Sequence, residues 1–96
     1  MPKFVIERDL PGAGQLSNDQ LIEISRRSCT VLSELATGIQ WVHSYVTDDK
    51  IYCVYIATDE ERVLLHARRG GFPADVIARV HHIIDPVTAE AAVLAS

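Results

Sequence analysis

Cysteine is scarce in this sequence, which has 96 residues and two cysteines, Cys29 and Cys53. Two cysteines cannot form the disulfide framework that stabilises many small secreted domains, so we expect both to be free thiols. The chain also has no apolar run long enough for a membrane helix, and residues 1–10 lack the layout of a signal peptide. These absences predict a cytoplasmic protein with no membrane partner.

Basic residues are also in the minority, since the chain has 9 lysines and arginines against 13 aspartates and glutamates. Proteins that bind nucleic acids generally carry a basic patch that displaces counterions, so a net charge of −4 argues against a nucleic-acid partner. What the chain does have is ordinary globular composition, with 48% apolar residues. A chain of 96 residues has room for one core.

The first predicted element is a strand over residues 3–8, where apolar and polar side chains alternate. Phe4 and Ile6 then share one face of the strand. Val5 and Glu7 share the other. The apolar pair Phe4 and Ile6 suits a core, so Val5 and Glu7 are expected to lie on the side of the sheet away from it.

Two helices are predicted from their first turns. Ser17 and Gln20 have the spacing of a capping box, in which two side chains satisfy free backbone donors reciprocally. Thr58 and Glu61 repeat that spacing at the start of a second helix. Glycines are expected to end the helices, at Gly38 and at Gly70–Gly71.

Residues 39–57 predict a β-hairpin. Both arms are rich in β-branched and aromatic residues, and Asp48 and Asp49 suit the turn between them. A final strand is predicted over about residues 77–84.

The turn sets which hairpin residues face each other. A two- or four-residue turn places His43 opposite Val54 and Tyr45 opposite Tyr52, with Cys53 on the other face. A one-residue slip would reverse the second arm. The sequence alone therefore leaves the facing of Cys53 open.

The order of elements is β-α-β-β-α-β, which predicts an α+β, ferredoxin-like fold. Right-handed crossovers place both helices on one face of a four-stranded antiparallel sheet with strand order 4-1-3-2. We expect residues 1–86 to form this single domain. Residues 87–96 form a C-terminal tail, either a short helix or frayed chain.

The uncovered side of the sheet, here called the open face, is predicted from charge. Arg79 is not expected under helices, so Ile77, Arg79, His81 and Ile83 are placed outward. The full predicted face is Val5, Glu7, Trp41, His43, Tyr45, Tyr52, Arg79 and His81. A face so rich in aromatics has to be covered, and two copies packed sheet to sheet would form a homodimer.

The candidate metal ligands are the imidazole, carboxylate and thiolate groups of His43, His81, Glu7 and Cys53. No recognised zinc spacing is present. His81 and His82 are adjacent on the predicted strand and point to opposite faces. His43 and His81 fall on opposite edges of the sheet, roughly 14 Å apart, so a site that uses both needs the dimer partner.

Other roles for the same face remain open. His43 with Tyr45 and Glu7 could serve as base and donors in a cofactor-independent enzyme or in a small-molecule-binding module. Nothing marks a nucleophile, so the sequence favours a protein that is not an enzyme. A third alternative is a purely structural dimerisation domain, in which the aromatic residues only join two copies.

The hairpin carries a family resemblance. The resemblance lies in residues 41–46, 49–50 and 52–55, and in the later run that includes His66-Ala67 and Gly71-Phe72-Pro73-Ala74. Here the sequence resembles a small bacterial domain-of-unknown-function family that includes a nickel-responsive, nickel-binding protein. The resemblance spans residues 3–86. It implies a ferredoxin-like homodimer and nickel or another divalent transition metal as cofactor. Four positions match its motif, of which His43 and Cys53 are metal donors; the others are Ser44 and Tyr45.

Overall fold

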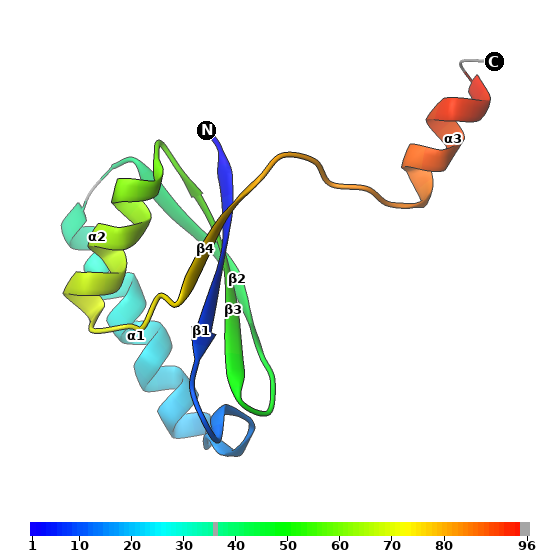
Figure 1. Cartoon of the computed structure of the whole chain (residues 1–96). Coiled ribbons are helices and arrows are strands. Elements are labelled where there is room, and N and C mark those ends of the chain that lie inside the picture. Colours follow the sequence, from blue (N-terminus) through cyan, green and yellow to red (C-terminus); the bar gives the residue numbers. More distant parts are fainter. Residues whose placement is uncertain (36, 95–96) are drawn as a thin grey trace.

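The structure of the protein, a computed structural model, describes residues 1–35 and 37–94 (Figure 1). Its elements follow the predicted order, with a short 3-10 helix after the first strand and a third α-helix near the C-terminus. The bounds are β1 Lys3–Asp9, η1 Ala13–Gln15, α1 Asn18–Leu35, β2 Ile39–Val46, β3 Lys50–Ala57, α2 Glu60–Gly70, β4 Val76–Val80 and α3 Pro86–Leu94.

The four strands form one antiparallel sheet in the order β2-β3-β1-β4. This is the predicted order 4-1-3-2 read from the other edge. Figure 1 shows α1 and α2 together on one side of the sheet, as right-handed crossovers require. The predicted ferredoxin-like α+β fold is confirmed.

The core lies between the sheet and the two helices. Phe4 and Ile6 of β1 are 4% and 0% exposed, and they pair with Tyr55 and Cys53 of β3 on the same side. The helices contribute further buried apolar side chains, Val31 and Leu35 from α1 and Val63 and Ala67 from α2. Alternation along β1 and β3 therefore places every second residue in the core.

The helix starts confirm one capping prediction and correct the other. Ser17 N–H donates to Gln20 Oε1 at 2.9 Å, and Gln20 N–H donates to Ser17 Oγ at 3.2 Å. At α2 the cap is Asp59, not Thr58, because the Asp59 carboxylate accepts from the Arg62 N–H at 3.0 Å. A carboxylate also suits the positive end of a helix dipole.

The hairpin has the predicted register over its distal half. His43 pairs with Val54 and Tyr45 pairs with Tyr52, so these four residues lie on the open face. Cys53 pairs with Ile6, which places it on the helix side, where it is 5% exposed. The facing of Cys53 that the sequence left open is thereby decided.

A β-bulge lies between Trp41 and His43. It inserts one residue, Val42, so that Trp41 pairs with Tyr55 on the helix side and packs against the core. The predicted position of Trp41 on the open face is wrong, because strict alternation does not hold across a bulge.

The last strand differs from prediction in facing and in length. Ile77 pairs with Ile6, and Arg79 pairs with Phe4, so both belong to the helix side rather than the open face. Arg79 is nevertheless exposed, because β4 is an edge strand and a long side chain can reach water from the rim. β4 ends at Val80, not Ile84, so His81 is exposed beyond the strand.

The C-terminal segment projects away from the sheet as an arm, residues 81–94 (Figure 1). Its helix α3 begins at a cap in which the Thr88 N–H donates to Asp85 Oδ1 at 3.2 Å. Ile83 and Ile84 in the arm are 66% and 81% exposed. Within the described residues, no helix combines the length and apolar character needed to cross a membrane.

Candidate functional site

A cavity of about 660 Å³ lies on the helix side, between α1 and the β2 edge of the sheet. Most of its lining is apolar. The apolar side chains come from α1, β2, β3 and two loops: Leu10, Leu16, Leu21, Ile24, Trp41, Val42, Val46, Ile51 and Phe72. Its volume falls within the range of about 300–1,000 Å³ that small-molecule pockets occupy. A small-molecule site was predicted on the open face, whereas this cavity lies on the helix side and includes only His43 of the residues named for that site.

The floor of the cavity holds a buried arginine, Arg8, which is 4% exposed. It continues the alternation of Phe4 and Ile6 on the helix side of β1. Its Nη1 donates to the Pro73 carbonyl at 2.7 Å, and its Nη2 donates to the Tyr55 hydroxyl at 3.2 Å. All these partners are uncharged, and the two ion pairs seen in the described residues both belong to Lys50.

Cys53 completes the polar surroundings of Arg8. Its Sγ accepts from Arg8 Nε at 3.3 Å. Cys53 faces the helix side with Ile6, whereas His43 pairs with Val54 on the open face, so these two predicted metal donors are not brought together within a chain.

A second buried polar group, His66, lies behind the cavity floor. Its Nε2 is 3.1 Å from Ser28 Oγ, while its Nδ1 has no hydrogen-bond partner among the described residues. Burial, and then the charge of Arg8, lower the pKa of His66 to about 4. Burial likewise raises the pKa of Tyr55 to about 12. Both groups are therefore neutral at pH 7 and leave the charge of Arg8 uncompensated.

Phe72 forms one wall beside this cluster, and a glycine makes room for it. A Cβ added to Gly70 would lie 2.1 Å from Phe72 Cε2, so a larger residue at that position would displace the ring. The guanidinium carbons of Arg8 and Arg27 lie 5.0 and 4.8 Å from the ring centroid. Such cation–π contacts stabilise both positive groups beside the cavity.

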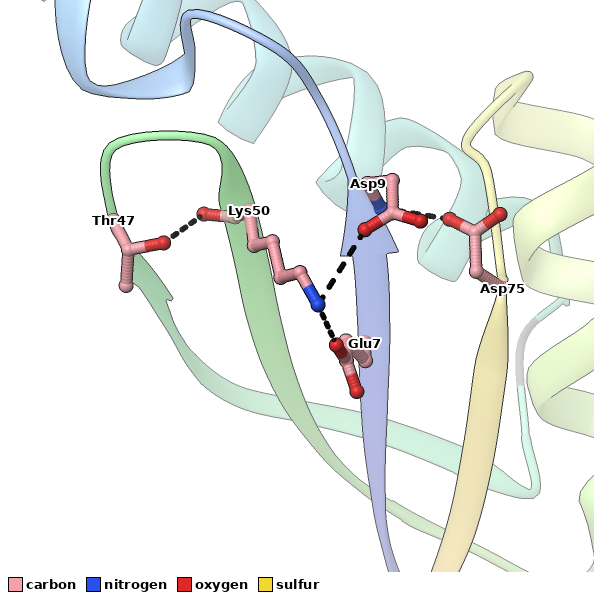
Figure 2. A network of polar contacts seen from close by, with 5 residues as sticks. All are labelled: Glu7, Asp9, Thr47, Lys50 and Asp75. Atoms are coloured by element: carbon pink, nitrogen blue, oxygen red, sulfur yellow. Dashed lines mark hydrogen bonds and ion pairs between the residues drawn. The ribbon is translucent and has the colours of Figure 1, made fainter.

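The predicted ligand Glu7 lies on the open face in the polar network of Figure 2. Its carboxylate accepts a hydrogen bond from Lys50 Nζ, which also lies 3.6 Å from Asp9 Oδ1. The hydrogen bond and charge of Glu7 raise the pKa of Lys50 above its ordinary value. A metal ion would have to compete with Lys50 for this carboxylate.

His43 also lies on the open face, near the β2 edge. Its ring packs edge to face on Tyr45 with centroids 4.8 Å apart. Tyr45 pairs with Tyr52, which pairs in turn with Glu7, so these three form one row across the sheet. His43 and Glu7 are separated by the whole of β3, about 10 Å at the usual strand spacing.

The predicted metal ligands are therefore not brought together within one chain. Cys53 faces the helices, His81 lies beyond β4, and no described residues form a cluster of three or more metal-donor side chains. The donor side chains described in one chain therefore do not form a site for a transition-metal ion. Arg8 was not predicted as a site residue, although its position two residues after Ile6 on the buried face was a signal.

A family model described as "Nickel responsive protein SCO4226-like" matches residues 4–80. The chain belongs to this family. The matched range includes the hairpin motif from which the family was predicted, and that prediction is confirmed.

Among solved structures, the crystal structure of SCO4226 from Streptomyces coelicolor A3(2) is similar, with a TM-score of 0.70 and 21% sequence identity. The alignment covers 85% of this chain and 99% of that one. At this identity the likeness supports the fold of this member of the family. A search of curated proteins found no match.

Proposed function

We propose that this member of the nickel-responsive family is a non-enzymatic homodimer that binds nickel or a similar divalent transition-metal ion between two copies. The observation that carries the proposal is the exposed imidazole of His43 on the open face, beside Tyr45. Imidazole is a good donor to nickel, copper and zinc ions. The family name makes nickel the first ion to test.

The second copy is needed because of the donor geometry. The described residues of one chain place His43 and Glu7 about two strand spacings apart and Cys53 on the other side of the sheet. Two open faces packed together would double the number of imidazoles at one interface. His43 from each copy would then bind the ion, with further donors from the surrounding interface.

Two features support the homodimer. The open face exposes apolar and aromatic surface, including Tyr45 at 59% and Val76 at 49%. The arm also presents Ile83 and Ile84 to solvent and extends away from its own sheet (Figure 1). Exposed apolar surface of this kind commonly marks an interface between proteins.

Titration calorimetry of metal-free protein with Ni²⁺ and Zn²⁺ tests the metal site. We expect binding tighter than millimolar, and His43→Ala should weaken it at least about tenfold because an interfacial imidazole is lost. Cys29→Ala removes an exposed metal-donor side chain from α1, outside the open face and the arm, and as the control should leave binding unchanged. Binding no tighter than millimolar would overturn the metal proposal, and equal affinities in wild type and His43→Ala would remove His43 from the site.

Light scattering after size exclusion tests the homodimer. At micromolar concentration we expect twice the chain mass of 10.6 kDa. Val54 lies on the open face between Val5 and His43, so Val54→Lys should shift the protein to monomer by placing a charge in the interface.

Ile22→Lys is the control for this substitution, since Ile22 is 47% exposed on α1. It should leave the dimer intact. A wild-type monomer at micromolar concentration would contradict the homodimer, and a dimer in Val54→Lys would move the interface away from the open face.

A further inference from the structure

The charged side chains of the cavity under α1 are opposite in sign to the net charge of the protein. The chain has a formal net charge of −4, yet the charged side chains that line the cavity are Arg8 and Arg27. No aspartate or glutamate from the described part of the chain lines it. A negatively charged ligand would therefore be attracted to this cavity.

Arg8 has hydrogen-bonding capacity left for such a ligand. A guanidinium has five N–H donors. The described residues supply three acceptors, on Pro73, Tyr55 and Cys53. A buried charge without a counter-charge is costly, and a bound anion would offset that cost directly.

We propose that this cavity binds an apolar carboxylic acid as its anion, with the carboxylate on Arg8 and the hydrocarbon body against α1 and Trp41. One buried guanidinium matches one negative charge. A phosphate would bring a second charge into an otherwise apolar site, at a further desolvation cost. The apolar walls supplied by Leu21, Ile24 and Trp41 favour an aliphatic or aromatic chain over a small polar acid.

This site uses different residues from the metal proposal. The carboxylate is assigned to Arg8 and the hydrocarbon body to α1 and Trp41, whereas the metal proposal rests on the imidazole of His43, which also borders the cavity. The variants at Arg8 and Ser25 leave His43 in place, so they test the carboxylate site separately from the metal site.

Trp41 is the single tryptophan of the chain and lines the cavity, so its fluorescence reports on occupancy. Decanoate is the probe, titrated by fluorescence and by calorimetry, with decanol as the uncharged analogue. We expect saturable binding of decanoate at one site per chain and about 10–100-fold weaker binding of decanol, because decanol cannot form the charged hydrogen bonds.

Variants of the floor and wall separate the two contributions. Arg8→Met should remove the preference for decanoate over decanol, and Arg8→Lys should restore part of it. Ser25 lines the cavity from α1, so Ser25→Phe should fill the space and weaken both probes at least about tenfold. Ser33→Phe makes the same change at an exposed site on α1 outside the cavity and should leave both affinities unchanged.

The proposal stays testable even if Arg8→Met does not fold. The wild-type protein still compares decanoate with decanol, and Ser25→Phe still compares with Ser33→Phe. Equal affinity for decanoate and decanol would overturn the role of Arg8. Equal effects of Ser25→Phe and Ser33→Phe would overturn the location. Tighter binding of decyl phosphate than of decanoate would overturn the carboxylate assignment.

Discussion

Lowering the pH from 6.5 to 4 should reduce the free energy of unfolding by on the order of 3 kcal/mol through His66. The pKa of this imidazole falls from 6.5 to about 4 on folding, mainly because it is buried. The unfolded chain therefore takes up the proton first as the pH falls. The contribution of His66 to stability is fully present above pH 6.5. It is lost progressively as the pH falls to about 4.

Chemical denaturation at a series of pH values measures this loss. His66→Gln retains a hydrogen-bonding side chain toward Ser28 but cannot titrate, so its stability should change less over the same pH range. His82→Gln changes an exposed histidine and should follow the wild type. If His66→Gln and wild type lose stability in parallel, His66 is not the group responsible.

Replacing Ile6 by alanine should lower the free energy of unfolding by about 2–5 kcal/mol. Ile6 is 0% exposed on central strand β1, packed beneath the helices. The isoleucine side chain is larger than that of alanine, so its removal leaves a cavity. The surrounding side chains cannot fill this cavity completely, because Phe4 and Cys53 are held by the sheet.

Ile56→Ala is the matched control for Ile6→Ala. It removes the same atoms from the neighbouring central strand, but Ile56 pairs with Lys3 and lies on the open face. We expect Ile56→Ala to lower the free energy of unfolding by no more than about 1 kcal/mol, measured by urea unfolding of dilute protein. Equal losses from the two variants would show that Ile56 is as well packed as Ile6. That result would contradict a sheet that is covered by helices on the Ile6 side alone.

The two faces of the sheet thus carry different chemistry. The open face has an exposed imidazole, aromatic rings and a carboxylate held by Lys50, which suits an interface between copies. The helix side has an apolar cavity with an uncompensated guanidinium at its floor. Both faces are built from alternate residues of the same strands, so one short sequence such as Glu7-Arg8 serves both.

Much of the fold was predictable because it depends on local rules. Alternation in β1 and the density of β-branched residues in the hairpin indicate strands, and the Ser17–Gln20 capping box indicates the start of α1. The order of these elements then leaves few topologies with right-handed crossovers. The family motif of the hairpin was also readable from the residues alone.

The candidate site was predicted only in part. His43, Tyr45, Tyr52 and Glu7 do lie on the open face, because their register follows from the hairpin turn and from alternation in β1. Arg79 was misplaced because its charge was taken as evidence of an outward face. On an edge strand, a long charged side chain can start on the helix side and still reach water.

The amino-acid sequence by itself determined the order of the elements and the hairpin turn, since these depend on residues that are close together in the chain. The facing of Trp41 and the burial of Arg8 were decided only by the tertiary structure. A bulge moved Trp41 to the core side, where it packs against residues from other strands. Arg8 is buried by partners 45 to 65 positions away, so no local pattern could reveal its surroundings.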